Sequence, residues 1–577
     1  METRESVIDL LDNIAARLEL TGENPFKIRA YHNASRAIAA LEGDLKEQTL
    51  SGGLKNVKGI GQSIFETIRE LIDTGRSSLL EELKKEIPES LMEMLEIPGL
   101  GPKKVKVIYE KLGISTLGEL EYACLENRLL TLEGFGEKTQ ENILQGIRHW
   151  KKGSGYFHYD RAFEEAKQVL NFLEKSTLFH ELELAGSLRR HKEVVKDIDL
   201  VGSSENPAAA MACFTSLPLV DRVVAHGETK SSVLLKSGIH ADLRIVTPEQ
   251  FPFALHHFTG SREHNTALRG VAKDLGFKMN EYGLFREGDT LVPCKSEKEI
   301  FGALGFKFIP PELRENLGEF EPARTGSLPS LVEPADIRGI FHVHTTYSDG
   351  KNSLSEIIGE AIRLGYEYIG ISDHSRSAFY AHGLSEEDIQ KQHDEIDRLQ
   401  KQHAGIRIFK GIESDILDDG SLDYPDKILS AFDFVIGSVH SRFKMDEPEM
   451  TRRMLNALAN PYLTMLGHLT GRLLLSRPSY PLDLEAVLEG ARKGGVIIEL
   501  NANPHRFELD WRDCRRAKEK GIKVSINPDA HGLDHLRFTE YGVGIARKGW
   551  LSPEDVFNTL SLKKVDAWLN ERKTKAG

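Results

Sequence analysis

The first 150 residues alternate apolar and polar side chains with the spacing of amphipathic helices. Apolar residues recur three and four positions apart from Val7 to Leu18, and again from Ile64 to Ile72. This period places the apolar side chains on one face of an α-helix and the charged side chains on the other. The pattern therefore predicts an all-α N-terminal region.

The pattern changes from about Phe179 onward, where short runs of branched residues are separated by turn-forming residues. Such runs are typical of β-strands, and they cover residues 182–185, 198–201, 232–235 and 241–246. The stretch from Gly318 to Ala335 has no periodicity and carries Pro, Gly and Ser, which favours a linker. Beyond it, apolar strands alternate with amphipathic helices, for example over residues 354–362. This alternation predicts a βα-repeating barrel, and residues 571–575 are expected to form a solvated, frayed tail.

Composition narrows the class of protein. The chain has 577 residues, of which 40% are hydrophobic and 28% charged, so roughly three to five soluble domains are expected. No apolar run approaches the roughly 18 residues of a membrane-spanning helix, and the N-terminal sequence has no signal-peptide pattern. Four separated cysteines without a C-x-x-C pair fit a reducing cytoplasm. The net charge of −13 means that any contact with DNA must come from local patches or backbone amides.

Histidines and acids gather beside the strand-like runs of the C-terminal region. Because a strand alternates faces, His342 and His344 are expected to point the same way. The carboxyl ends of strands are where α/β folds collect active sites, and mixed imidazole and carboxylate ligands suit Zn, Mn or Fe. Scattered surface or core histidines would not explain so many near strand ends. The residues that predict a shared metal site are His342, His344, Asp349, Asp373, His374, Glu413, His440, His468, Asp529 and His531.

Two segments of the helical region place a Gly-apolar-Gly turn before a helix. The turns contain Gly59 and Gly61 in the first segment and Gly99 and Gly101 in the second, and a weaker copy covers residues 132–138. Such a turn lets the backbone approach another molecule and points free N–H groups at an anion. One copy alone would fit a plain helix–helix turn. Repetition favours helix-hairpin-helix motifs that bind the DNA backbone without reading its sequence.

A second group of carboxylates lies in the strand-rich middle region. Asp197 and Asp199 alternate along one predicted strand and so share a face, and Asp242 lies inside another strand. Three convergent carboxylates stay ionised together only with cations, and Mg²⁺ (or Mn²⁺) fits. Two such ions about 3.5–4 Å apart stabilise the attacking and the leaving oxygen of an in-line phosphoryl transfer. Ahead of the aspartates stand Gly186, Ser187 and Arg190; Ser187 and Arg190 are expected to hold a triphosphate.

With these residues assembled, the chain resembles a bacterial family X DNA polymerase with a C-terminal polymerase-and-histidinol-phosphatase (PHP) domain. The polymerase signature appears as Gly186-Ser187-x-x-Arg190 with the three aspartates. Residues 258–269 are similar to the family's nucleotide-binding turn and thumb helix. The resemblance implies that Phe258 and Gly260 lie along the deoxyribose, that Asn265 reaches the incoming base edge, and that Arg269 reaches the template minor groove.

The histidine and acid motifs match the nine ligands of PHP domains, and Asp373 is not among them. The resemblance implies up to three Mn²⁺, Zn²⁺ or Fe ions and cleavage of DNA 3′ ends and abasic sites. One ion is expected on His342, His344, Glu413 and Asp529; a second on Glu413, His440 and His468; and a third on Asp349, His374 and His531.

The resemblance also implies a multidomain fold. It combines an all-α helix-hairpin-helix region, an α+β nucleotidyltransferase palm with a thumb, and a distorted TIM-like α/β barrel. The expected divisions are an N-terminal helical domain over 1–85, a fingers-like helical domain over 86–154, a palm over 155–250, a thumb over 251–317, a linker over 318–336 and a PHP domain over 337–577.

The sequence departs from animal members of the family at three positions tied to function. Thr67 stands where a helix lysine forms the Schiff base of a sugar-phosphate lyase, and Ser63 stands at the nearby lysine position. A hydroxyl cannot form the imine, so a lyase would need another amine such as Lys27 or Lys55. His257 replaces the tyrosine before Phe258, at a position tied to rejection of ribonucleotides.

The leading hypothesis is a monomeric, cytoplasmic repair polymerase that fills short gaps. Its substrates would be gapped or nicked DNA and deoxynucleoside triphosphates, without a membrane, and its PHP domain would be a 3′–5′ exonuclease and abasic-site endonuclease. One alternative is a DNA-binding scaffold whose palm no longer polymerises and whose only chemistry is PHP hydrolysis. Another is a small-molecule phosphatase of the histidinol-phosphate type, which leaves the hairpins without a purpose.

Overall fold

The chain divides into two compact units, residues 1–151 and 152–577. The structure, a computed structural model, describes residues 4–39, 41, 45–151, 155–286 and 289–576. The predicted boundary at residue 154 lies outside the described residues, and the finer predicted divisions within each unit stay predictions. No helix among these residues is long and apolar enough to cross a membrane.

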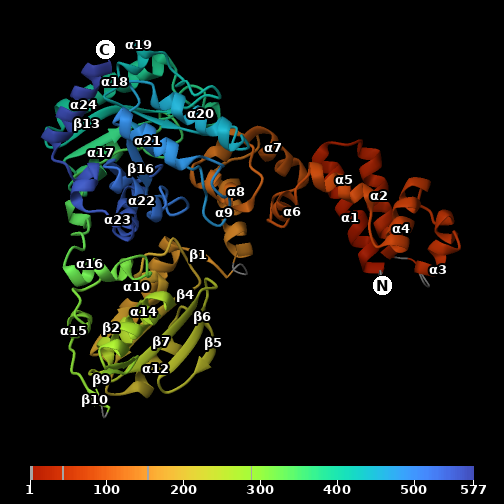
Figure 1. Cartoon of the computed structure of the whole chain (residues 1–577). Helices are drawn as coiled ribbons and strands as arrows, with labels where there is room; N and C mark the ends of the chain where they lie inside the picture. Colours follow the sequence, from red (N-terminus) through yellow and green to blue (C-terminus); the bar gives the residue numbers. More distant parts are fainter. Residues whose placement is uncertain (1–3, 40, 42–44, 152–154, 287–288, 577) are drawn as a thin grey trace. The chain divides into compact units, whose positions relative to one another are not determined.

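The first unit is built from helices, as its sequence pattern predicted (Figure 1). Two apolar clusters hold it together, one centred on α1 and α2 and the other on α7 and α8. The helices are α1 Arg4–Thr21, α2 Pro25–Ala39, α3 Leu45–Leu50, α4 Gln62–Thr74, α5 Ser78–Glu86, α6 Glu89–Leu95, α7 Pro102–Leu112, α8 Leu117–Leu125 and α9 Glu137–Lys151, with 3₁₀ helices η1 Gly53–Asn56 and η2 Arg128–Thr131.

The second unit begins with a mixed sheet in the strand order β2-β4-β7-β6-β5. The central strands β4 and β7 run parallel, and the other neighbouring pairs run antiparallel. Helices α10 and α12 bury their apolar faces in the same core as this sheet. The elements are β1 Phe157–His158, α10 Tyr159–Glu174, β2 Glu181–Leu184, α11 Gly186–Arg189, β3 Val194–Val195, β4 Asp197–Ser203, α12 Pro207–Thr215, β5 Val220–His226, β6 Lys230–Leu235 and β7 His240–Val246.

A smaller α+β layer follows the mixed sheet. Its antiparallel strands β8, β9 and β10 share a core with α14 and α15, centred on Leu268 and Phe301. The elements are α13 Phe251–Thr259, α14 Arg262–Asp274, β8 Lys278–Asn280, β9 Gly283–Arg286, β10 Thr290–Leu291, α15 Glu297–Ala303 and η3 Pro311–Leu313.

The segment predicted as a linker is ordered and partly buried. It contains the helix α16 Phe320–Thr325 and the 3₁₀ helix η4 Pro334–Asp336. Ala323 and Val332 are fully buried, and the backbone N–H of Val332 donates to Leu551 at 3.0 Å. The sequence of this segment shows no periodicity because isolated apolar residues, such as Ala323 and Val332, attach it to the core, and not because the segment is solvated.

The C-terminal part is a parallel sheet of seven strands in the sequential order β11 to β17, flanked by helices (Figure 1). This confirms the predicted TIM-like α/β barrel. Its strands are β11 Gly339–Ile340, β12 Tyr368–Ile371, β13 Arg407–Asp415, β14 Phe434–Ser438, β15 Met465–Leu466, β16 Ile497–Asn501 and β17 Val524–Asn527. Its helices are α17 Leu354–Arg363, η5 Phe379–Ala381, α18 Glu386–Gln402, α19 Asp426–Leu429, α20 Glu447–Leu458, α21 Leu484–Gly494, α22 Trp511–Glu519, η6 Leu533–Arg537, α23 Phe538–Lys548, η7 Pro553–Asp555, η8 Phe557–Thr559 and α24 Leu562–Ala576.

The first and last strands of the barrel are joined through the segments that follow them. Val343 and Ala530 form a parallel bridge, in which the N–H of His344 donates to Ala530 at 2.9 Å and the N–H of Ala530 donates to His342 at 3.1 Å. Nearer the strand starts, the Asn558 side chain donates to Gly339 at 3.1 Å and to Ile526 at 3.0 Å. The barrel therefore closes through residues adjacent to the predicted metal ligands.

The predicted frayed tail is instead part of helix α24. Val565 and Leu569 of this helix are buried in the aromatic cluster that contains Phe341 and Phe434 of the barrel. Lys573 donates to the carbonyl of Phe432 at 3.0 Å. The basic residues near the C-terminus made this segment look solvated in the sequence. In the structure Lys573 donates to a backbone carbonyl of the barrel, while the same helix buries Val565 and Leu569.

Candidate active sites and nucleic-acid interface

Three turns of the helical unit share one backbone geometry. Each opens with a glycine of positive φ: Gly59 at 104°, Gly99 at 87° and Gly134 at 85°. Helices α4 and α7 begin directly after Gly61 and Gly101, whose backbone is extended. The residues between the two glycines of each turn, Ile60, Leu100 and Phe135, are buried.

The two glycines of a turn are required for different reasons. The first has a left-handed backbone, which costs other residues about 1–2 kcal/mol. Gly61 and Gly101 have ordinary φ angles of −82° and −88°, are exposed, and have open space where a Cβ would stand. Their missing side chains leave the start of each helix accessible to an anion. This geometry fits a DNA phosphate, and the assignment of Gly59, Gly61, Gly99 and Gly101 to DNA binding stays a prediction.

Helix α4 also contains the position considered for a lyase. Thr67 is buried, and its hydroxyl donates to the carbonyl of Ser63 at 3.1 Å. The alternative amines lie elsewhere: Lys27 pairs with Glu23 at 2.8 Å, and the Lys55 ammonium lies 4.8 Å from the Phe65 ring centroid. A buried hydroxyl at position 67 supplies no amine for an imine.

The three predicted palm aspartates lie on the parallel pair β4 and β7. Asp199 is directly opposite Asp242 in the register, and Asp197 precedes Asp199 by two residues on the same face of β4. Burial, together with the charges of Asp197 and Asp242, raises the pKa of Asp199 to about 7. Burial and Asp242 also raise the pKa of Asp197. This donor set fits divalent cations, which relieve repulsion between neighbouring carboxylates.

The palm site also depends on Gly186, the first residue of helix α11. Gly186 has a φ of 62°, and an added Cβ would lie 2.1 Å from Oδ2 of Asp199. Any side chain at this position would collide with the carboxylate or displace it. The pattern Gly-Ser ahead of an Asp-x-Asp strand thus has a steric basis here.

Lys230 and the predicted triphosphate-binding residue Arg190 both have protein partners. Lys230 Nζ lies 2.7 Å from Oδ2 of Asp242. Arg190 Nε donates to Glu315 at 3.0 Å, and its Nη1 donates to the carbonyl of Thr259 at 2.7 Å. Arg190 therefore braces the start of the thumb in this structure, and its contact with a triphosphate, like that of Ser187, stays a prediction.

The predicted nucleotide-binding block forms the turn between α13 and α14. An added Cβ at Gly260 would lie 2.4 Å from Oδ1 of Asn265. Asn265 Nδ2 donates to the carbonyl of His257 at 2.7 Å, so the amide braces the turn that carries Phe258. Arg269 is exposed on α14, and its Nε donates to the Asn265 carbonyl at 3.2 Å. Roles of these residues toward a nucleotide remain predictions.

The barrel brings the predicted PHP ligands together in its interior. Glu413 lies in β13, and the others follow the carboxyl ends of strands, as the sequence pattern suggested. The argument from strand alternation was only partly right, because β11 ends at Ile340 and His342 has a φ of 60°. Turn geometry, not pleating, directs His342 inward. The clustered and buried residues are His342, His344, Asp349, His374, Glu413, His468, Asp529 and His531, with His440 nearly buried.

The geometry around His344 fits shared metal ions. Its two ring nitrogens form no hydrogen bond with the described part of the chain. Nδ1 lies 3.7 Å from Oδ1 of Asp349. Nε2 lies 3.6 Å from Oε2 of Glu413 and 3.4 Å from Oδ1 of Asp529. The separations from Asp349 and Glu413 are too long for hydrogen bonds, and the separation from Asp529 is longer than that of an ordinary one. They match the spacing of about 3.4 Å between tetrahedral ligands that each lie about 2.1 Å from a zinc ion.

Overlapping groups of donor atoms in the described part of the barrel could hold metal ions, and four of them contain predicted ligands alone. In each group the ligand atoms lie within 4.8 Å of one another. The groups overlap the expected assignment but place His344 with the Asp349 set and His374 also with Glu413, so the division among ions stays a prediction. The groups are His344, Asp349, His374 and His531; His342, Glu413 and His468; His342, His344 and Asp529; and His374, Glu413 and His440.

Asp373 belongs to none of these four groups. Its carboxylate accepts from the Thr345 backbone and hydroxyl, both at 2.7 Å, and from Gln392 Nε2 at 2.6 Å. Burial raises its pKa to about 6. Asp373 therefore ties together the segments beside the cluster.

Two carboxylates that sequence reasoning missed orient ligand histidines. Glu499 Oε1 lies 2.6 Å from Nδ1 of His342, and Asp415 Oδ1 lies 2.6 Å from Nδ1 of His440. Such partners fix the tautomer and leave Nε2 for a metal. Burial alone would lower the pKa of His342, but Glu499 and the other nearby carboxylates raise it well above its usual value. The signal for Glu499 was a single acid inside the apolar run 496–500, the same signal that singled out Glu413.

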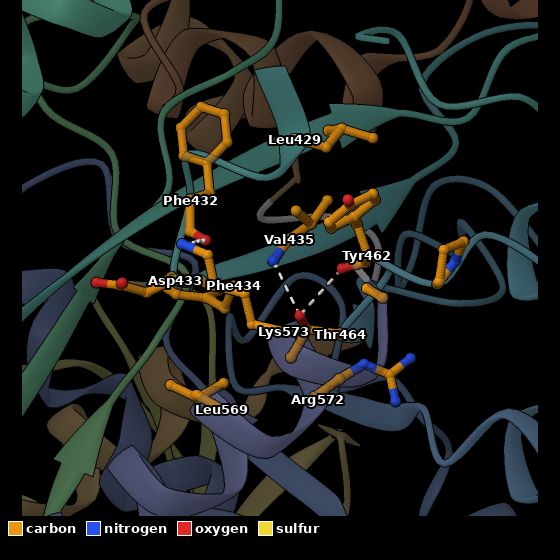
Figure 2. Close-up of a pocket in the computed structure, with 12 residues that line it drawn as sticks. Leu429, Phe432, Asp433, Phe434, Val435, Tyr462, Thr464, Leu569, Arg572 and Lys573 are labelled. Atoms are coloured by element: carbon orange, nitrogen blue, oxygen red, sulfur yellow. Dashed lines mark hydrogen bonds between the residues drawn. The ribbon is translucent and has the colours of Figure 1, made fainter. Parts of the chain in front are cut away.

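A pocket in the same barrel lies apart from this cluster. It is formed by the start of β14, residues 461–464 and α24 (Figure 2). None of its lining residues is a predicted ligand, and Thr464 ties its wall by accepting from the Val435 N–H at 3.1 Å. Because active sites of βα barrels lie at the carboxyl ends of strands, this pocket is assigned to packing of the C-terminal helix.

Comparison with known proteins gives matches along the chain. Family models match at residues 2–77 (helix-hairpin-helix domain), 91–149 (SAM-like helix-hairpin-helix tandem), 254–315 (DNA polymerase beta thumb) and 341–503 (PHP domain). The DNA polymerase/3′-5′ exonuclease PolX of Bacillus subtilis (strain 168) is 40% identical over 569 residues, which cover 98% of this chain and 99% of that protein. The chain belongs to the bacterial family X DNA polymerases with a PHP domain.

Two further relatives are shorter than this family X polymerase. A probable phosphatase of Thermoanaerobacter sp. (strain X514) is 30% identical over 248 residues, which cover 41% of this chain and 96% of the phosphatase. A probable phosphatase of Caldanaerobacter subterraneus subsp. tengcongensis is 31% identical over 255 residues, covering 41% of this chain and 92% of the phosphatase. The palm is included in the longer alignment with the Bacillus subtilis protein, which spans nearly the whole chain.

Proposed function

We propose that this family X polymerase fills short gaps during DNA repair and cleaves DNA 3′ ends and abasic sites with its PHP domain. Its substrates are gapped or nicked DNA and deoxynucleoside triphosphates, and it works in the reducing cytoplasm. The observation that carries the proposal is the presence of two chemically distinct centres in one chain. One is a partly buried set of carboxylates on β4 and β7, and the other is a buried histidine-rich cluster at the carboxyl ends of the barrel strands.

At the palm, Asp197, Asp199 and Asp242 would hold Mg²⁺ or Mn²⁺. Divalent ions bound there would stabilise the attacking and the leaving oxygen of an in-line phosphoryl transfer. To bind a metal ion, Asp199 must lose the proton that its raised pKa favours. Asp242 must replace its contact with Lys230 by a contact with the ion. Gly186 leaves the space that the Asp199 carboxylate occupies.

At the barrel, the nine predicted ligands would hold Mn²⁺, Zn²⁺ or Fe ions. Such ions, when bound, would make a water molecule acidic enough to act as the nucleophile toward a phosphodiester at neutral pH. Asp415 and Glu499 keep the Nε2 atoms of His440 and His342 directed at Glu413, which lies 3.3 Å and 3.2 Å from them. This arrangement supports hydrolysis of a DNA strand, while the preference for 3′ ends and abasic sites rests on the family.

The test uses a 5′-labelled primer on a one-nucleotide gapped duplex with Mn²⁺, with and without deoxynucleoside triphosphates. Extension with nucleotides and shortening without them would support both centres. A second duplex with an internal abasic site tests the endonuclease, and a duplex with an intact base in its place is the matched control. Shortening without extension would favour the scaffold-plus-nuclease alternative and reject the polymerase proposal.

A further inference from the structure

An exposed aromatic side chain stands beside the PHP cluster. Phe379 is 76% exposed, more than any other large hydrophobic residue described in residues 152–577. It lies in the short helix η5, within the loop that follows the ligand His374. Single exposed apolar residues are common on proteins, so the position of Phe379 needs support from its surroundings.

The loop that carries Phe379 is held in place on both sides. Ser377 donates its backbone N–H to Asp423 at 2.6 Å and its hydroxyl to Asp415 at 2.8 Å. On the far side, the N–H of Leu384 donates to the His374 carbonyl at 2.9 Å. Asp415 also orients the ligand His440. The same carboxylate therefore fixes a metal ligand and the loop that presents the aromatic ring.

A chain of rings connects Phe379 to the cluster. The Phe379 and Tyr380 ring centroids are 6.0 Å apart. The Tyr380 ring in turn lies 6.3 Å from His374 and 6.4 Å from His440. Phe379 is thus linked to the two ligands through the ring of Tyr380.

Two partly exposed arginines lie near ligands in the sequence, and each has an aspartate partner: Arg376 Nη2 lies 3.9 Å from Asp423, and Arg442 Nε lies 3.4 Å from Asp418. Arg376 precedes Phe379 by three residues, and its side chain is 57% exposed. Arg442 follows the ligand His440 by two residues, and its side chain is 67% exposed. A groove that binds single-stranded nucleic acid combines such cations, which contact phosphates, with aromatic rings on which bases stack.

We propose that Phe379 is a stacking platform for a nucleobase next to the phosphodiester that the PHP cluster cleaves. This inference rests on the proposed nuclease function and adds a base-binding subsite to it. Because every base has an aromatic face, stacking on Phe379 would tolerate any sequence. It would hold an unpaired 3′ end in place while its phosphodiester lies at the ligands.

The test compares Phe379→Ala, Phe379→Trp and wild-type full-length protein on a single-stranded 3′ overhang with Mn²⁺. A second overhang carries tetrahydrofuran in place of both nucleotides that flank the scissile bond, so no base is present to stack. Loss of one stacking contact predicts a drop of about 10-fold in kcat/KM for Phe379→Ala on the normal overhang. Phe379→Trp should keep near wild-type activity. Both variants should match wild type on the baseless overhang.

The matched control is Phe172→Ala, which removes another exposed phenylalanine (42% exposed) from helix α10 and should leave both substrates unaffected. An equal loss for Phe379→Ala on both overhangs, or no loss on either, would overturn the stacking role while leaving the nuclease function intact. Wild-type protein that cleaves neither overhang would reject the nuclease function itself.

A binding measurement tests the subsite without cleavage. The probe is an oligonucleotide with 2-aminopurine at its 3′ end and a phosphorothioate at the terminal linkage. Stacking on Phe379 should quench the probe's fluorescence with wild type and with Phe379→Trp, but much less with Phe379→Ala. Equal quenching by wild type and Phe379→Ala would contradict the proposal, whatever the nuclease assay gives.

Discussion

His342 and Glu499 contact each other inside the barrel, with 2.6 Å between Nδ1 and Oε1. Glu499 lies in β16 and also accepts the backbone N–H of His468 at 2.7 Å. One carboxylate therefore positions two ligands that are far apart in the sequence. Because the pair is buried, no solvent molecule can easily replace the lost contact when either side chain is changed.

Glu499→Gln is expected to lower exonuclease activity and bound metal by about 10–100-fold, the usual effect of losing a partner behind a metal ligand. Nucleotide addition should stay near wild type. Metal content by mass spectrometry and the two activities measure this. Glu485→Gln, on the surface of α21, is the control and should change nothing. Full metal content and exonuclease activity in Glu499→Gln would show that His342 needs no such partner.

The two centres should be separable by mutation. Asp197→Ala is expected to reduce nucleotide addition to background while shortening of the primer continues, because it removes one carboxylate of the palm. His342→Ala combined with His344→Ala should do the reverse. Circular dichroism would check that each variant is folded. If either folded variant lost both activities, the model of two independent centres would be wrong.

Nucleotide addition should depend on pH in a way that Mg²⁺ changes. The pKa of Asp199 is raised to about 7 by burial and by its two aspartate neighbours, above the value of about 3.9 in unfolded chains. Between about pH 3.9 and about pH 7 the Asp199 carboxyl is protonated in the folded protein but ionised in the unfolded chain, so the stability of the metal-free protein falls as pH rises. In the same range, protons compete with metal ions for this carboxylate.

The expected result is a midpoint near pH 7 for nucleotide addition at low Mg²⁺, which moves to lower pH at saturating Mg²⁺. Rates from pH 5.5 to 8.5, an assay range of roughly one and a half units on each side of the pKa, measure this. Lys230→Met should move the midpoint upward, because Lys230 lowers the pKa of Asp199. If the pH midpoint of nucleotide addition were the same at low and at saturating Mg²⁺, protonation of Asp199 would not control metal binding.

The hairpin turns offer a matched pair of substitutions. Gly101→Ala should leave stability unchanged, because its φ is −88°, and should weaken DNA binding several-fold by placing a methyl group before α7. Gly99→Ala should instead destabilise the helical unit by about 1–2 kcal/mol, because its φ is 87°. Fluorescence anisotropy with gapped DNA and chemical unfolding separate the two effects. Unchanged DNA affinity in Gly101→Ala would remove this turn from the interface.

The sequence alone determined the classes of structure and the candidate chemistry. Helical periodicity marked the first unit, and strand–helix alternation marked the barrel, because burial on one face imposes these periods locally. The ligand positions were also readable, since His374 and Asp529 stand beside apolar strands in the sequence. Local patterns are sufficient where the chemistry and the element are neighbours in the chain.

Only the tertiary structure decided which distant residues meet. The inward turn of His342, the partners Glu499 and Asp415, and the contact of Lys230 with Asp242 depend on packing between elements that are far apart in sequence. The same holds for the ordered segment around Ala323 and for the docked helix α24. No local period encodes such contacts, because burial and electrostatic pairing arise only when the folded chain brings those surfaces together.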